Sequence, residues 1–231
     1  MTDDPARDPE RLMREFRLGD DDTGAWRASG LPPEAFPDWL TDRIARRPAG
    51  RRAREVYGAP DAHHFARGPI LAALAVGPTD HLLEVGCGGG LLLREALATG
   101  ARVTGLDHSE EMARLARQQA PGAGVVCAAA ERLPFPDGTF SALAMSVVFF
   151  FLADPVGVLT ECGRVLRPGS RVAIFTTGPE LRGTPAAPEP VASLGHFYSD
   201  GQLAGLARAA GLRDVRVRND GGGQLLTART P

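Results

Sequence analysis

The pattern of apolar and polar residues changes at His81. From there on, short apolar runs alternate with segments in which apolar residues recur every three or four positions. The short runs predict buried strands at 82–85, 102–106, 125–127, 142–148 and 171–175. The segments between them predict helices at 91–99, 110–120 and 155–166. Strands that alternate with helices indicate a parallel sheet with right-handed crossovers.

The last fifty residues follow a different pattern. The stretch 178–195 is rich in Pro, Ala and Gly, which predicts a long loop over the sheet edge. Ser199 and Gln202 form a capping box for a helix that runs to about residue 210. Apolar runs at 214–218 and 224–228 then predict a closing antiparallel hairpin.

The N-terminal quarter lacks this alternation. Residues 1–30 show little periodicity and predict a partly ordered leader with one short helix near 9–18. Five prolines divide 31–60 into short helical pieces, and a further helix is predicted at 62–76. We therefore predict two parts: a leader and helical cap at 1–60, and a main domain at 61–231. Within that domain, the segment 178–198 is expected to cover the substrate.

Charge and composition narrow the functional classes. The formal net charge is -2, so the six arginines between Arg43 and Arg54 favour a solvated helical face over a nucleic-acid contact. All 26 basic residues are arginines, which excludes a P-loop and a pyridoxal-phosphate Schiff base, since both need a lysine. Three widely spaced cysteines, Cys87, Cys127 and Cys162, argue against a disulfide framework or a structural zinc site.

The start of the chain and its apolar runs bear on location. The first ten residues are acidic and lack the apolar segment of a signal peptide. The longest apolar run, 142–153, is too short to span a bilayer. We expect a cytoplasmic protein with a small-molecule substrate, without nucleic-acid or membrane partners; a homodimer is left open.

A glycine-rich turn follows the first strand of the domain. Gly86, Gly88 and Gly90 lie between Glu84 and a predicted helix. Without side chains they let a ligand lie against the backbone, and N–H groups at the helix start favour an acidic ligand group. The spacing differs from the GxGxxG pattern of dinucleotide enzymes, because the sixth position is Leu91.

An acidic residue, Asp107, ends the second strand. It lies about 20 residues beyond the glycine turn, where a carboxylate can accept both ribose hydroxyls of a nucleoside. The turn and Asp107 together predict a cofactor that contains a nucleoside.

Taken together, these segments resemble the class I, Rossmann-like S-adenosylmethionine-dependent methyltransferases, especially their ubiquinone- and menaquinone-biosynthesis-like small-molecule branch. The resemblance runs from about residue 60 to 175, and a weaker similarity extends over 196–227. It rests on motifs at 83–90, 105–109 with Met112, 130–140 and 164–169. It implies a three-layer α/β sandwich with a mostly parallel seven-stranded sheet, a C-terminal antiparallel hairpin and an N-terminal helical cap.

The resemblance also implies a function and a site. The function is in-line methyl transfer from S-adenosylmethionine to O, N or C of a small molecule, leaving S-adenosylhomocysteine, with positioning as the main catalytic device and no metal. The implied cofactor residues are Glu84, Gly86, Cys87, Gly88, Gly90, Asp107, His108, Met112, Ala130, Glu131, Ser146 and Val147. Relatives usually carry an aspartate two residues before Glu131; here it is Ala129, so one adenine hydrogen bond is expected to be absent or replaced.

Residues that handle the acceptor are harder to predict. A general base is needed only if the acceptor must lose a proton, and His64 and His196 are the catalytic candidates. Substrate contacts are predicted for Tyr57, His63, Phe149, Phe150 and Tyr198. The alternatives are an S-adenosylmethionine-binding protein without methyl transfer, cyclase-like or regulatory, and, less favoured, an RNA or protein methyltransferase. An NAD(P) oxidoreductase is disfavoured by the glycine spacing.

Overall fold

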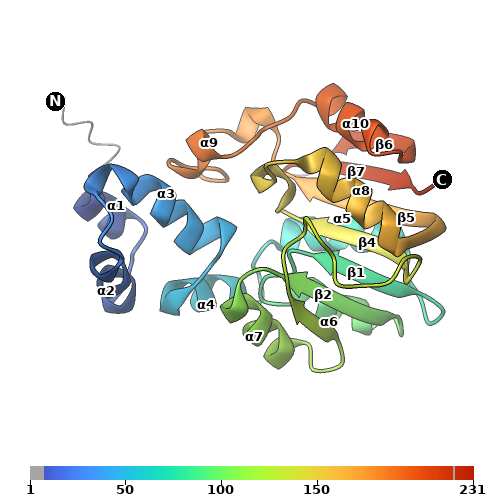
Figure 1. The fold of residues 1–231 in the computed structure, drawn as a ribbon, viewed down its shortest axis with the longest axis horizontal. Helices are drawn as coiled ribbons and strands as arrows, with labels where there is room; N and C mark the ends of the chain where they lie inside the picture. Colours follow the sequence, from blue (N-terminus) through green and yellow to red (C-terminus); the bar gives the residue numbers. More distant parts are fainter. Residues whose placement is uncertain (1–7, 221) are drawn as a thin grey trace.

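A single mixed sheet forms the centre of the molecule. The computed structural model describes residues 8–220 and 222–231 (Figure 1). Within these residues seven strands occur: β1 (His81–Val85), β2 (Arg102–Asp107), β3 (Gly124–Cys127), β4 (Phe140–Ser146), β5 (Leu166–Thr176), β6 (Arg213–Asn219) and β7 (Gln224–Arg229). Their order is β3-β2-β1-β4-β5-β7-β6. The first five strands are parallel and β7 is antiparallel to both neighbours, as the resemblance implied.

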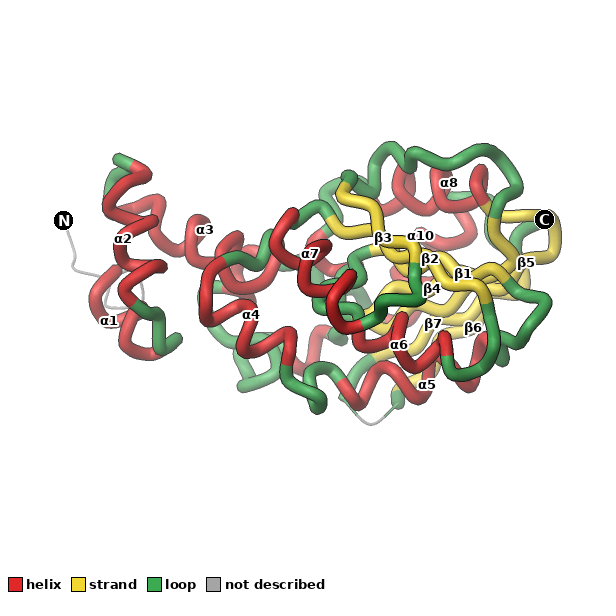
Figure 2. Tube along the Cα trace, turned by 90° about the horizontal axis from the view of Figure 1, so that it is seen from below, coloured by secondary structure: helices red, strands yellow, loops and turns green. Residues whose placement is uncertain are grey.

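Helices cover both faces of the sheet (Figure 2). One face carries α5 (His64–Leu74), α6 (Leu91–Leu97) and α7 (Glu110–Gln119), and the other carries α8 (Pro155–Val165) and α10 (Asp200–Ala209). Successive strand residues point to opposite faces, so Leu82 belongs to one buried apolar cluster with Ile70 of α5, whereas Leu83 belongs to another with Leu159 of α8. Both side chains are fully buried, as expected for a parallel strand between two helical layers.

The N-terminal helices form a cap with a small core of its own. They are α1 (Pro9–Glu15), α2 (Asp20–Ser29), α3 (Phe36–Thr41) and α4 (Gly50–Gly58), with a π-helical turn at Asp42–Arg46 between the last two. Leu12, Phe36 and Leu40 are buried together, and the ring of Trp26 meets Phe36 edge-on at 4.9 Å. In Figures 1 and 2 this group lies at one end of the molecule.

Helix α2 corrects the prediction of a leader with one short helix. Its ten residues contain few apolar side chains, which is why periodicity missed it. The run Asp20–Asp22 occupies its first turn, where negative charge stabilises a helix, and Gly30 ends it in a left-handed conformation. Residues 1–7 of the predicted leader lie outside the described residues.

Polar contacts fix the cap to the sheet domain. The Ser109 hydroxyl donates to the Pro48 carbonyl at 2.6 Å, and the Gly50 N–H donates to a Glu111 carboxylate oxygen at 2.6 Å. These contacts place the segment between α3 and α4 over the end of β2.

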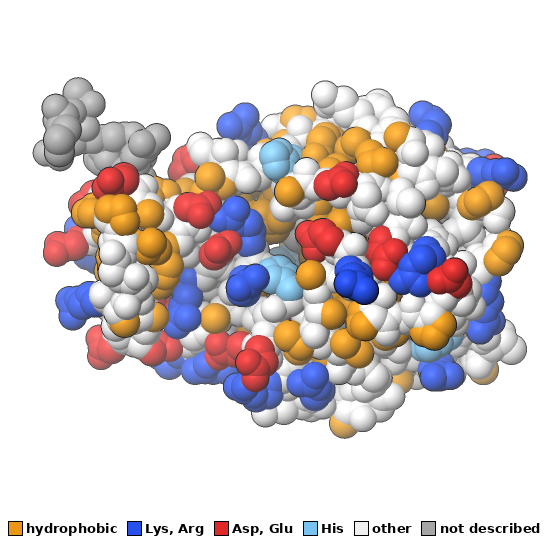
Figure 3. Space-filling model, in the orientation of Figure 1, with side chains coloured by type: hydrophobic (Ala, Val, Ile, Leu, Met, Phe, Trp, Pro, Cys, Tyr) orange, Lys and Arg blue, Asp and Glu red, His pale blue; other side chains and the backbone are white. Residues whose placement is uncertain are grey.

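The arginine cluster is largely neutralised by carboxylates. Five of its members form ion pairs: Arg43 with Asp22, Arg46 with Asp38 and Asp42, Arg51 and Arg52 with Glu55, and Arg54 with Glu111. The face seen in Figure 3 accordingly carries acidic and basic side chains intermixed. Arg51 and Arg54 are exposed, as the prediction of a solvated helical face requires.

The remaining segments differ from the prediction in detail. The predicted loop at 178–195 contains a short helix, α9 (Val191–Leu194), which contacts α3 of the cap. Strand β5 begins at Leu166, five residues before the predicted start, and its register against β4 shifts there. Ser199 and Gln202 make the predicted capping box. In the part of the chain that the structure describes, no helix is both long and apolar enough to cross a bilayer.

Candidate functional site

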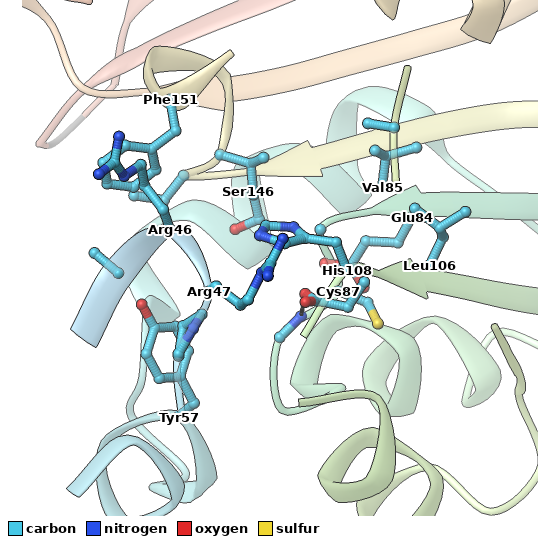
Figure 4. A pocket seen from close by; sticks show the side chains of 18 of the residues that line it. Arg46, Arg47, Tyr57, Glu84, Val85, Cys87, Leu106, His108, Ser146 and Phe151 are labelled. Atoms are coloured by element: carbon cyan, nitrogen blue, oxygen red, sulfur yellow. Dashed lines mark hydrogen bonds between the residues drawn. The ribbon is translucent and has the colours of Figure 1, made fainter. Parts of the chain in front are cut away.

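A cavity of about 320 Å³ lies between the cap and the carboxyl ends of β1, β2 and β4 (Figure 4). Ligands of open α/β sheets bind at this edge of the sheet. The cavity brings together most of the predicted cofactor residues: Glu84, Gly86, Cys87, Gly88, Asp107, His108, Ala130, Glu131, Ser146 and Val147. Two others do not line it. Met112 is fully buried at the start of α7, and Gly90 packs against Ala116.

Asp107 is buried at the end of β2 and is held by two backbone groups. One carboxylate oxygen accepts the Gly88 N–H at 2.8 Å and the other accepts the Ser109 N–H at 2.8 Å. Burial raises the pKa of Asp107, and these two hydrogen bonds oppose the rise. Each oxygen of a carboxylate has a second lone pair, so Asp107 can still accept hydroxyl groups from a ligand in the cavity.

Glu84, at the end of β1, is a buried carboxyl group that the protein leaves incompletely bonded. Its side chain is 2% exposed, and its Oε2 atom has no hydrogen-bond partner among the described residues. Burial raises its pKa well above the ordinary value, and the nearby carboxyl groups of Asp107 and Glu95 raise it further. An unpaired buried carboxyl group is costly, and a cationic ligand group beside it would offset that cost.

The glycine turn supplies space rather than free donors. The N–H groups of Gly86 and Cys87 both donate to the Leu106 carbonyl, at 2.7 and 3.0 Å, and the Gly90 N–H donates to the Cys87 carbonyl at 2.9 Å. With Gly88 bound to Asp107, four N–H groups of the turn are engaged inside the protein. These four N–H groups are therefore not available to an acidic ligand, whereas the helix for whose first N–H groups that role was predicted begins at Leu91.

The end of β4 has an unusual backbone conformation. Val147 has φ 58°, which is rare for a β-branched residue and is typical of strained functional sites. Its N–H donates to the Phe175 carbonyl at 2.8 Å. The next side chain, Val148, packs directly over Gly86, where a side chain at position 86 would collide with it. The unusual conformation of Val147 thus places the apolar side chain of Val148 against the glycine turn.

The other wall of the cavity comes from the cap and from the loop after β4. Tyr57 and His63, two predicted substrate contacts, line the cavity. Phe149 and Phe150 do not: Phe149 packs against Tyr198 at 5.9 Å and Phe150 stacks on Phe197 at 5.5 Å.

Phe151, the third residue of the phenylalanine run, lines the cavity together with Val148 and Leu152. Local sequence could not distinguish these three phenylalanines, because the 3₁₀ turn at Phe149–Phe151 decides which ring faces inward.

The two predicted catalytic histidines lie apart from the cavity. His64 is exposed, and its Nδ1 atom lies 3.0 Å from the Asp61 carbonyl oxygen. His196 is also exposed, and its backbone N–H donates to the Phe150 carbonyl at 2.7 Å. Tyr198, which was predicted to contact the substrate, also does not line the cavity.

Sequence reasoning missed the arginines of the cavity. Arg46, Arg47 and Arg67 line it, although the first two had been assigned to a solvated face. In the described residues, no group of three or more His, Cys, Asp or Glu side chains is placed to hold a metal ion.

Comparison with known proteins identifies the family. A family model described as a methyltransferase domain matches residues 83–174. The demethylmenaquinone methyltransferase of Mycobacterium sp. (strain KMS) is 33% identical over 183 residues, covering 69% of this chain and 79% of that protein. The chain belongs to the S-adenosylmethionine-dependent methyltransferase family.

Other relatives match this chain over shorter stretches. The ubiquinone biosynthesis O-methyltransferase of Parvibaculum lavamentivorans is 35% identical over 118 residues, covering 48% of this chain and 47% of that protein. The first curated relatives are covered over only 20% to 47% of their length. An S-adenosylmethionine-dependent methyltransferase of Aquifex aeolicus has the same fold: the TM-score is 0.67 at 23% identity, over 78% of this chain and 97% of that one.

The cavity fits the cofactor of this methyltransferase family. The unpartnered Glu84 oxygen suits the cationic amino group of S-adenosylmethionine, and the remaining acceptor capacity of Asp107 suits its ribose hydroxyls. The raised pKa of Glu84 gives this fit a measurable consequence.

Cofactor binding is expected to release a proton from Glu84. In the free protein, burial raises the pKa of Glu84, so the group stays protonated at pH values at which an ordinary glutamate is ionised. In the complex, the adjacent ammonium group of the ligand would lower this pKa again. Between these two pKa values, affinity for S-adenosylhomocysteine should therefore rise with pH. Calorimetric titration in buffers of different ionisation enthalpy measures the release directly. Glu84→Gln should abolish it; an unchanged release in that variant would assign the proton to another group.

Proposed function

We propose that this chain transfers the methyl group of S-adenosylmethionine to a small organic acceptor and releases S-adenosylhomocysteine. The observation that carries the proposal is the pair of buried carboxyl groups, Glu84 and Asp107, which end adjacent strands and line one cavity. Relatives named for ubiquinone and menaquinone biosynthesis support a small-molecule acceptor.

The chain's own contribution to the reaction is positioning. The bound cofactor supplies a methyl group activated by a sulfonium. Glu84 would hold the amino group of the cofactor and Asp107 its ribose, while Val148, Phe151 and Leu152 form an apolar wall that excludes water. Holding the reacting atoms in line can supply several kcal/mol of the barrier reduction, on the order of 7–11 kcal/mol in the best cases.

For an acceptor that must lose a proton, we assign the base to His63. This residue lines the cavity, and burial together with the Arg67 charge lowers its pKa, so it is neutral at pH 7 and can accept a proton. Its ring meets that of Tyr57 edge-on at 5.6 Å, which fixes its orientation. The cavity lining thus favours His63 over His64 and His196.

Several further predictions concern the whole protein. Cap residues Arg46, Pro48 and Tyr57 line the cavity, which supports residues 1–60 as a cap on the domain at 61–231. The segment 178–198 does not line the cavity; α9 packs on α3 instead, so we infer that it supports the cap. A cytoplasmic location and a homodimer stay predictions.

Calorimetric titration with S-adenosylmethionine and S-adenosylhomocysteine tests the cofactor assignment, and a radiolabelled-methyl assay tests transfer to phenols, quinols, amines and carboxylic acids. We expect micromolar affinity for both nucleosides and product formation with at least one acceptor class. A folded protein that binds neither would contradict the proposal. Tight binding without transfer to any class would instead favour a binding protein that has no methyltransferase activity.

NADH is not expected to compete with S-adenosylhomocysteine at millimolar concentration. Val148 packs over Gly86, and the spacing of the glycines differs from that of dinucleotide enzymes. The backbone of the turn is therefore not open to the close contact that a pyrophosphate group needs. Displacement of bound S-adenosylhomocysteine by NADH, followed by calorimetry, measures this. Clear competition at equal concentrations would reopen the oxidoreductase interpretation.

A further inference from the structure

Arg47 differs from the other five arginines of the cap cluster. Each of those five forms an ion pair with a carboxylate. Arg47 has neither an ion pair nor a side-chain hydrogen bond among the described residues, and it lines the cavity. Its guanidinium, always charged and with five donors in a fixed fork, is therefore available to a ligand.

The backbone around Arg47 is firmly placed. The Arg47 N–H donates to the Asp42 carbonyl at 2.8 Å, and the carbonyl of the next residue, Pro48, accepts the Ser109 hydroxyl at 2.6 Å. In Figure 4 the side chain extends from the cap into the cavity, toward His108 and Ser146. Ser146 is the last residue of β4. It lines the cavity together with Val148 and Phe151, which follow it in the chain and form the apolar wall.

The other two arginines of the cavity are already neutralised. Arg46 pairs with Asp38 and Asp42, and Arg67 pairs with Glu95 at 2.7 Å. Arg67 is also the arginine whose charge acts on the pKa of Glu84, so it lies at the end of the cavity that suits the amino acid part of the cofactor.

We propose that Arg47 binds a carboxylate group of the methyl acceptor, and hence that the acceptor is a carboxylic acid with an apolar body. This inference rests on the proposed function and names the acceptor class at the same site. The carboxylate would pair with Arg47 at the cap, while the apolar body would contact Val148, Phe151 and Leu152. A planar guanidinium suits a carboxylate because it can donate two parallel hydrogen bonds.

Pairs of acids and their neutral amides test this directly. The probes are benzoate with benzamide and octanoate with octanamide, titrated calorimetrically into the protein saturated with S-adenosylhomocysteine. Arg47→Gln removes the proposed contact. Arg52→Gln is the matched control, because Arg52 lies in the same segment, does not line the cavity and has only a 3.9 Å ion pair with Glu55.

We expect at least one acid to bind the wild-type protein about tenfold more tightly than its amide, since hydrogen bonds to charged groups are the strong ones. Arg47→Gln should remove that preference, and Arg52→Gln should keep it. No preference in the wild-type protein, or an equal preference in Arg47→Gln, would overturn the proposal.

A third outcome would also overturn it. If Arg47→Gln weakens S-adenosylhomocysteine itself but not its decarboxylated analogue, then Arg47 serves the cofactor carboxylate instead. Failure of the proposed function is distinguishable from these outcomes. In that case the wild-type protein would not bind S-adenosylhomocysteine at all, and the affinities of the acids and amides would be compared in its absence.

Discussion

Replacement of Gly88 by valine is expected to abolish binding of S-adenosylmethionine in a protein that still folds. Gly88 forms part of the cavity floor with φ 49°, and a Cβ atom there would lie 3.3 Å from the Tyr57 ring. A branched side chain at this position fills the space where the cofactor must approach the backbone. Calorimetry with S-adenosylhomocysteine should detect no binding.

Because Gly88 has a left-handed backbone conformation, valine at this position also costs about 1–2 kcal/mol of stability. A control variant must show the same loss of stability. Gly138→Val is that control, because Gly138 has φ 61° and open space around its Cβ position. Both variants should lose similar free energy of unfolding in urea, but only Gly88→Val should lose the cofactor. Retained binding in Gly88→Val would place the cofactor elsewhere.

Asp107→Ala is expected to weaken cofactor binding about tenfold or more. Hydrogen bonds to charged groups contribute about 1.5–3 kcal/mol, and the substitution also leaves the N–H groups of Gly88 and Ser109 without their acceptor. The variant should therefore lose both affinity and stability. Titration with S-adenosylhomocysteine and urea unfolding measure the two effects separately.

Asp154→Ala separates these two effects. Asp154 accepts the Gly157 N–H at 2.9 Å at the start of α8 and does not line the cavity. Loss of this cap should cost about 1 kcal/mol of stability without changing affinity. An Asp107→Ala variant with unchanged affinity would remove Asp107 from the cofactor site.

The sequence predicted those features that depend on local pattern. Strands such as β1 and β2 read as short apolar runs because parallel strands are buried on both faces. The glycine turn and Asp107 were found together because each directly follows such a run. The family resemblance implied the antiparallel hairpin, but the position of β7 between β5 and β6 was not predicted, since no local pattern dictates the order of strands.

Features set by distant contacts could not be predicted in this way. Helix α2 is held by packing of Trp26 on Phe36, and by the Asp22–Arg43 ion pair, rather than by its own periodicity. Arg47 could not be singled out among six arginines, because the partners of the other five include Asp22 and Glu111, which are distant in sequence. The engaged turn amides depend on the Leu106 carbonyl of a neighbouring strand.

The contrast between Gly86 and Glu84 bears on how this family changes over evolution. Gly86 is required by the fold itself, because Val148 occupies the space that any side chain would need and because its φ of 73° favours glycine. A descendant that had lost catalysis would therefore keep this glycine. Glu84 is the opposite case: its buried oxygen has no hydrogen-bond partner among the described residues, which lowers stability, and under the proposed function the cofactor offsets that cost. Once the ligand is gone, selection for stability would replace it, so an acidic residue at position 84 is the better marker of a lineage that still uses its cofactor.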